Sequence, residues 1–193
     1  ADKAFVKKML CIGASETTTS AFKAVEIANT YPNIWASIGV HPHDAGHTQT
    51  LDSMEELLTN LKVVAIGETG LDFFREWAPV EEQRKLFRNT IAFARNCKKP
   101  LIIHSREAGE EVFQTLKEHK ADEIGGVFHC YAEDAEFAKK LLDINFIVSF
   151  PGTITFKKAN PLREIAKAIP LEQIMLETDT PYMAPEPFRG GES

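Results

Sequence analysis

The sequence has few cysteines, no long apolar run and no excess of positive charge. Its 193 residues include three cysteines without a CxxC pair, which favours reduced thiols and argues against a disulfide framework, a zinc finger or a redox motif. No apolar segment approaches the roughly 18 residues needed to cross a bilayer, and the amino terminus has no signal-peptide pattern. We therefore expect a cytoplasmic protein with no membrane partner.

The net charge of −6 argues against a broad electrostatic clamp on a long duplex, because such binding needs extensive basic surface. It does not exclude nucleic acid, since a metal site brings its own positive charge to a phosphate. Neither GxGxxG nor GxxxxGK[ST] occurs after an apolar run. The nucleotide-binding versions of an open parallel sheet therefore lose their main support.

Strand-like and helix-like segments alternate along the whole chain. Short apolar runs predict strands at 9–14, 34–40, 61–67, 101–104, 126–129, 146–150 and 174–177. Apolar residues at helical spacing predict helices at 18–30, 51–61, 79–97, 108–120, 134–143 and 161–168. Continuous apolar strands that alternate with helices are typical of a parallel sheet covered on both faces.

The fold class expected from this alternation is α/β, as an open doubly wound sheet or a barrel. Polar residues at the downstream ends of several strands favour the TIM (β/α)8 barrel, whose functional site is built from these ends. A complete barrel typically needs around 250 residues, and seven strands are visible. We therefore expect one domain over 1–193 with one strand absent, and 1–8 as the tail of a preceding helix.

Four metal-capable side chains follow apolar runs: Glu68, His104, His129 and Asp179. Because parallel strand ends meet at one edge, their repetition at βα spacing predicts a single site. Nitrogen and oxygen donors together suit zinc, manganese or a similar divalent ion, and are less selective for magnesium. Each residue has an alternative reading when taken alone. Glu68 could form a structural salt bridge, Asp179 could cap a turn, and each histidine could be an ordinary hydrogen-bonding residue.

Further residues of the same edge are candidates for substrate contact. His41 and His43 follow the second strand and could touch substrate or support metal ligands, or belong to a plain loop. Arg106 could hold a phosphate bidentately, or pair with a nearby carboxylate. Lys157 is a further cation at this edge.

Several segments occur in the order and spacing of one known family. They are GVHPH at 39–43, IGETGLD at 66–72, IHSREA at 103–108, FHCY at 128–131 and LETDTPY at 176–182. FPGTITFK at 150–157 and PEPFRG at 185–190 continue the match. The chain resembles the TatD family of metal-dependent deoxyribonucleases, within the amidohydrolase-like metal hydrolases.

The resemblance implies a TIM barrel that cleaves phosphodiester bonds, as a 3′-to-5′ exonuclease on single-stranded DNA, with RNA as another candidate substrate. It implies that Glu68, His104, His129 and Asp179 bind one or two divalent ions (Mg, Mn or Zn), with Glu68 bridging two ions where two are present. Asp179 is then expected to be the general base, with Glu68 as the second catalytic residue. No obligate protein partner is evident.

The family pattern begins with a strand that carries a His-x-His pair, and it continues beyond the 185–190 segment into further helix. This chain has no such pair before 9–14. We therefore expect the first strand and the C-terminal helix to be missing from this chain. Two alternative functions stay open. One is hydrolysis of another ester or amide, such as aminoacyl-tRNA, and the other is a catalytically impaired binding protein if the His-x-His pair is truly absent.

Overall fold

The computed structural model describes residues 5–14, 18–46, 51–75 and 77–191, and these form two compact units that meet after Ile124. Each unit is described by itself. The prediction of a single domain over 1–193 stays a prediction. None of the helices in the described ranges is long and apolar enough to span a membrane.

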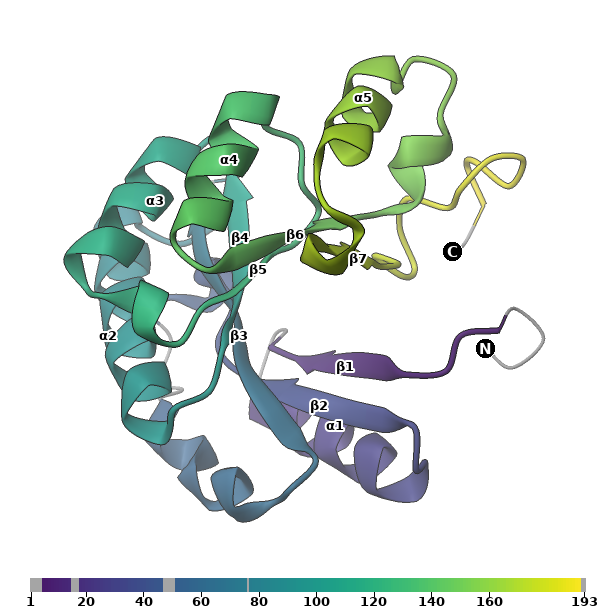
Figure 1. Ribbon diagram of the computed structural model, residues 1–193. Helices are drawn as coiled ribbons and strands as arrows, with labels where there is room; N and C mark the ends of the chain where they lie inside the picture. Colours follow the sequence, from purple (N-terminus) through teal and green to yellow (C-terminus); the bar gives the residue numbers. More distant parts are fainter. Residues whose placement is uncertain (1–4, 15–17, 47–50, 76, 192–193) are drawn as a thin grey trace. The chain divides into compact units, whose positions relative to one another are not determined.

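The first unit contains four parallel strands in chain order. They are β1 (Met9–Gly13), β2 (Ile34–Ile38), β3 (Val63–Asp72) and β4 (Leu101–Arg106). The helices are α1 (Thr18–Thr30), α2 (Val80–Cys97) and α3 (Gly109–Glu118), with 3₁₀ helices η2 (Pro42–Asp44), η3 (Leu51–Thr59) and η4 (Ala121–Glu123). Helix α1 packs on β1 and β2, and α2 packs on β3 (Figure 1).

Buried apolar side chains explain how α2 attaches to the sheet. Phe87, Ile91 and Ala94 lie one helical turn apart and are fully buried, so they form the stripe that faces the core. Glu81 and Glu82 lie in the first turn, where carboxylates interact favourably with the positive end of the helix dipole. The buried stripe therefore determines which face of α2 packs on β3, and the two carboxylates stabilise its first turn.

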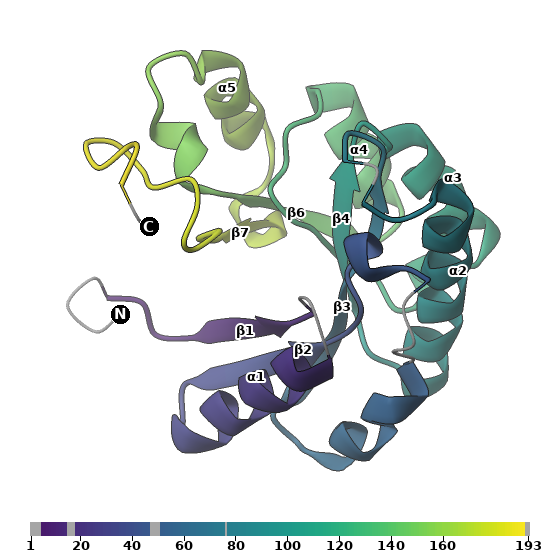
Figure 2. The same cartoon turned by 180° about the vertical axis from the view of Figure 1, so that it is seen from behind.

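The second unit contains three parallel strands, β5 (Gly126–Phe128), β6 (Phe146–Phe150) and β7 (Ile174–Leu176). Its helices are α4 (Ala135–Asp143) and α5 (Asn160–Ala168), with 3₁₀ helices η5 (Gly152–Thr155) and η6 (Leu171–Gln173). Helix α4 packs on β6 and contacts α5. Figure 2 shows these strands and helices from behind. The N–H of Phe137 donates to the Asp134 side chain at 2.8 Å, which caps the start of α4.

The alternation of strands and helices predicted from the sequence is confirmed, and three of its details are wrong. The segment at 51–61 forms a 3₁₀ helix that ends at Thr59. Residues 5–8 are not helical, and the rest of the expected helical tail lies outside the described residues. Strand β3 extends to Asp72 instead of ending at Gly67, so Glu68 lies inside the strand, with consequences for the site.

Candidate metal centre

A β-bulge in β3 sets the position of Glu68. Ile66 pairs with Leu101, but Thr69 pairs with Ile103, so β3 uses one residue more than β4 over this stretch. A bulge bends the strand locally and re-aims a side chain. The Glu68 side chain, 17% exposed, lies within reach of both His41 and His104.

Glycine is required on either side of Glu68. Gly67 and Gly70 have φ values of +137° and +141°, which side chains rarely adopt. A Cβ on Gly70 would lie 2.0 Å from the backbone oxygen of His104, and one on Gly67 would lie 2.5 Å from that of Ile102. These two positions therefore allow β3 and β4 to approach closely at the site.

His104 lies between two carboxylates of the neighbouring strand. It pairs with Gly70, and the residues two positions before and after Gly70 are Glu68 and Asp72. Its Nδ1 is 2.8 Å from Oε1 of Glu68, and its Nε2 is 3.1 Å from Oδ2 of Asp72. A metal-binding histidine commonly uses one ring nitrogen for the ion and donates from the other to a carboxylate. Both ring nitrogens of His104 face carboxylates here, and the contact with the buried Asp72 is the one that matches such a supporting carboxylate.

Asp72 is the supporting carboxylate of the centre. Its side chain is fully buried, its Oδ2 faces His43 at 2.7 Å as well as His104, and its Oδ1 accepts the N–H groups of Phe74 and Arg75. Burial raises the pKa of this carboxyl, but the hydrogen bonds from His104, Arg75 and His43 outweigh it, so the pKa lies well below its usual range. Asp72 is therefore a charged anchor for two imidazole rings.

Helix α2 holds the backbone of Asp72 through Gln83. The buried Gln83 side chain accepts the Asp72 N–H at 2.9 Å and donates to the carbonyls of Asp72 and Ala78 at 3.1 and 3.0 Å. All of these groups lie away from water, where an unpaired polar group is costly. The packing of α2 on β3 thus fixes the end of the strand that carries the site.

His41 is held in one orientation by the turn that it begins. Its Nδ1 accepts the backbone N–H of His43 at 3.1 Å, so a neutral His41 ring carries its proton on Nε2. That Nε2 lies 3.3 Å from Oε1 of Glu68. In this geometry His41 is a hydrogen-bond donor toward Glu68, which agrees with the predicted role in support or substrate contact.

The ring of His43 lies edge-on beside the ring of His41 and contacts Asp72. The two ring centroids are 4.3 Å apart. Burial and the neighbouring His41 lower the pKa of His43 despite the hydrogen bond to Asp72, which favours the neutral ring. Both side chains face the carboxylates of β3, and their contact with a substrate stays a prediction.

Two overlapping sets of donors in the described part of the chain suit a divalent ion. They are His41, Glu68 and His104, and His43, Asp72 and His104, each with ligand atoms within 4.8 Å of one another. Imidazole nitrogen with carboxylate oxygen is a donor set used for zinc and other divalent metals. Asp72 of the second set is fully buried and already accepts several hydrogen bonds, and both ring nitrogens of His41 in the first set already face the His43 N–H and Glu68. Glu68 and His104 are therefore the members of the first set that suit an ion best.

The predicted residues are divided between the units. Glu68 and His104 come together in the first unit, and Arg106 lies at the end of the same strand as His104. His129 and Asp179 belong to the second unit. Their joint role with Glu68 and His104 stays a prediction.

In the second unit the end of β5 is tied to the residue that follows β7. Glu177 accepts the Cys130 N–H through Oε1 at 2.6 Å, and its Oε2 lies 3.7 Å from Nδ1 of His129. Asp179 is half-buried, and its carbonyl accepts the N–H of Tyr182 at 2.7 Å. Asp179 therefore begins a turn through its backbone.

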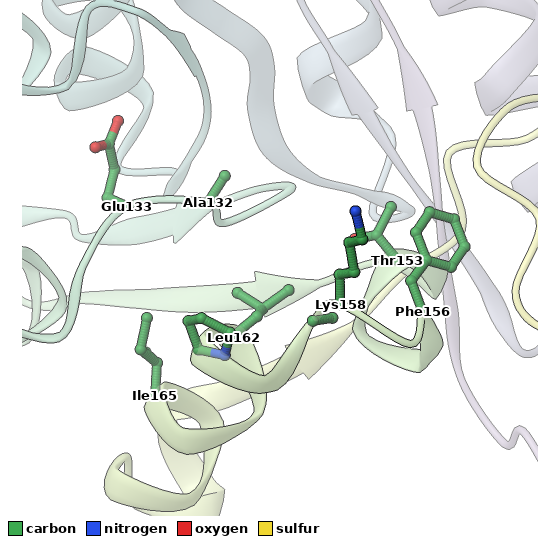
Figure 3. Close-up of a pocket in the computed structure, with 9 residues that line it drawn as sticks. Ala132, Glu133, Thr153, Phe156, Lys158, Leu162 and Ile165 are labelled. Carbon is green, nitrogen blue, oxygen red and sulfur yellow. The ribbon is translucent and has the colours of Figure 1, made fainter.

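A pocket of about 370 Å³ lies in the second unit (Figure 3). Thr153, Phe156 and Lys158 from the segment after β6 line it together with Leu162 and Ile165 from α5. None of the predicted metal ligands lines this pocket, and its lining is mainly apolar. Lys157 is exposed next to Lys158 and stays a predicted substrate contact.

Sequence reasoning missed Asp72 and Gln83 in the first unit and Glu177 beside His129 in the second unit. Asp72 could have been found by extending the strand, because Glu68, Gly70 and Asp72 alternate as one face of β3 would. The same spacing of two relates Glu177 to Asp179. For Gln83 the sequence gives no signal, because a buried glutamine on a helix is recognised only from what it contacts.

The family model described as TatD related DNase matches residues 1–193. The chain therefore belongs to the TatD family of metal-dependent hydrolases. Together with the parallel strands, this confirms the α/β fold of the TIM-barrel type. Among curated relatives, the uncharacterized metal-dependent hydrolase YabD of Bacillus subtilis is 41% identical over 96% of this chain and 72% of its own length.

Two other relatives extend the comparison. The 3′-5′ ssDNA/RNA exonuclease TatD of a Rahnella strain is 36% identical, over 88% of this chain and 67% of its own length. The crystal structure of YjjV, a TatD homologue from Escherichia coli K12, has a TM-score of 0.87 at 28% identity and covers all of this chain and 75% of YjjV. These comparisons establish the fold and the class of hydrolase.

Proposed function

We propose that the protein is a divalent-metal-dependent deoxyribonuclease that degrades single-stranded DNA from the 3′ end. The observation that carries the proposal is the cluster of His41, Glu68 and His104 in a chain of a metal-dependent hydrolase family. Glu68 and His104 are the proposed ligands of this cluster, and His41 is a hydrogen-bond donor to Glu68. The name of the Rahnella relative supports DNA or RNA strands as substrates. The free cysteines fit a cytoplasmic location.

The proposed metal ligands are Glu68, His104, His129 and Asp179, for one or two ions of Mg, Mn or Zn. Bound there, a divalent ion would lower the pKa of a water molecule and polarise a phosphoryl oxygen. The proposal gives Glu68 the bridging position where two ions are present. The contacts from His104 and His41, at 2.8 and 3.3 Å, hold its carboxylate ready for this role.

The remaining steps belong to side chains of the chain itself. The carboxylate of Asp179 accepts the proton of the attacking water. His41 donates from Nε2, and His43 is held beside it by Asp72. Arg106 and Lys157 bind phosphates of the DNA. Both are exposed cations, Arg106 as the last residue of β4 and Lys157 in the segment after β6.

The test is cleavage of a 5′-labelled single strand, read as progressive shortening, with and without a chelator. We expect metal-dependent shortening that is abolished in Glu68→Ala, His129→Ala and Asp179→Ala. His119→Ala, at the end of α3, is the matched control and should keep full activity. Undiminished turnover by purified Asp179→Ala would overturn its assignment as the base.

A panel of substrates tests the specificity. Aminoacyl-tRNA and simple carboxylic esters are measured beside the DNA strand under the same ions. The proposal expects the strand to be the preferred substrate. Chelator-sensitive cleavage of an ester, with no shortening of any strand, would instead identify a hydrolase of another ester with the same residues.

A further inference from the structure

Two large aromatic side chains are exposed beside the candidate metal centre. Phe74 and Trp77 follow directly after β3 and are 52% and 64% exposed. The Trp77 ring lies 4.6 Å from the ring of His43, which contacts Asp72. Large aromatic side chains are usually buried, because burial removes apolar surface from water. Rings that stay exposed next to a functional site often bind a ligand.

Each ring carries an arginine. The guanidinium of Arg106 lies 3.8 Å from the centroid of the Phe74 ring, and that of Arg75 lies 4.8 Å from the Trp77 ring. Planar cations stacked on aromatic rings present flat surfaces and phosphate-binding N–H groups side by side.

The segment is anchored to the site itself. The backbone N–H groups of Phe74 and Arg75 donate to Oδ1 of the buried Asp72, at 3.0 and 2.9 Å. The carboxylate that orients His43 and His104 therefore also fixes the start of the aromatic segment. Rings held in place before binding lose less conformational entropy when a ligand stacks on them.

We propose that Phe74, Arg75, Trp77 and Arg106 form a stacking surface for unpaired nucleobases next to the metal centre. Bases of a single strand stack on the rings, and the two arginines bind the adjoining phosphates, as proteins that bind single strands commonly do. Paired bases in a duplex cannot present their faces in this way. The inference rests on the proposed nuclease function and adds the residues that select a single strand.

The test uses tryptophan fluorescence and an oligothymidylate hexamer in Ca²⁺, with the strand checked for integrity afterwards. The chain has two tryptophans, so Trp35→Phe leaves Trp77 as the reporter. We expect the strand to quench Trp77, and Trp77→Ala or Phe74→Ala to raise the Kd measured by fluorescence anisotropy roughly 5- to 100-fold. Trp77→Phe, which keeps a ring, should restore most of the affinity.

A matched control separates stacking from general surface effects. Tyr31→Ala removes another exposed ring, 55% exposed and located just before β2 at the other end of the strands. It should leave the Kd unchanged. An abasic hexamer, which keeps the phosphates, should bind equally weakly to the wild type and to Trp77→Ala.

The outcomes distinguish this inference from the function on which it rests. Equal Kd values for the wild type and Trp77→Ala, in a protein that cleaves strands, would overturn the stacking surface alone. The stacking surface would also be overturned if Trp77→Ala weakened binding of the abasic hexamer as much as binding of the hexamer with bases, because the ring would then act without a base. A wild type that neither binds nor cleaves strands would remove the proposed function as well.

Discussion

Nε2 of His43 lies 2.7 Å from Oδ2 of Asp72, and the Asp72 side chain is fully buried. Nε2 of His104 lies 3.1 Å from the same oxygen, so one carboxylate oxygen orients two imidazole rings from different segments. Asp72 thus joins the turn after β2 to strand β4. A charged group with this many charge-assisted contacts supports the geometry of the whole centre.

Asp72→Asn should impair the centre without direct loss of a proposed ligand. Asparagine keeps the shape but lacks the charge, so the imidazoles of His43 and His104 lose a strong acceptor. We expect metal affinity and metal-dependent activity to fall about 10- to 100-fold, as for other supporting carboxylates. Calorimetric titration with the ion measures this, and Asp143→Asn, at the exposed end of α4, should behave as the wild type.

Gly70→Ala should destabilise the fold. Its φ of +141° is strained for alanine, and the added Cβ would lie 2.0 Å from the His104 carbonyl oxygen. We expect the free energy of unfolding to fall by roughly 2–4 kcal/mol, measured by urea denaturation. The matched control is Gly191→Ala, whose Cβ would lie 3.3 Å from the nearest atom. A Gly70→Ala protein as stable as this control would contradict the prediction.

Glu111→Gln should change the pH dependence of stability. Arg84 of α2 binds both oxygens of Glu111 in α3, at 2.5 and 2.9 Å, and these hydrogen bonds lower the pKa of Glu111. A lowered folded-state pKa stabilises the fold above the unfolded pKa of about 4.3, and this contribution is lost as the pH falls through the folded-state value. The partly exposed pair contributes about 0.2–1 kcal/mol.

The experiment compares denaturation of the wild type and Glu111→Gln at pH 7 and at pH 3. The difference in the free energy of unfolding should be present at pH 7 and should shrink toward zero at pH 3. Glu118→Gln, exposed in the last turn of α3, is the control. A difference that grows on acidification would contradict the sign of this prediction.

Divalent ions should raise the melting temperature of the protein through the candidate centre. At an ion concentration of 100 times the Kd, binding to the folded state adds about 2.7 kcal/mol, which corresponds to a shift of several degrees at this size. Differential scanning calorimetry with Mn²⁺ or Zn²⁺ measures it. His104→Ala should lose most of the shift, whereas His119→Ala should retain it, and equal shifts in both variants would place the ion elsewhere.

The sequence predicted the elements that depend on local pattern. Apolar runs located the seven strands, and the resemblance to the TatD family is confirmed by the family match. The limits of the third strand were wrong, because the apolar run ends at Gly67 whereas β3 continues through Gly67 and Gly70 to Asp72. That error placed Glu68 at a strand end and left Asp72 without a role.

What the sequence by itself determined is therefore the α/β class and the residue types of a metal site. These follow from hydrophobic periodicity and from motif spacing, both of which are local properties of the chain. Only the tertiary structure showed that the bulge in β3 turns Glu68 toward His104, that Gln83 holds Asp72, and that two exposed rings adjoin the centre. Strand register and helix packing decide such contacts, because they bring together groups that are far apart in sequence.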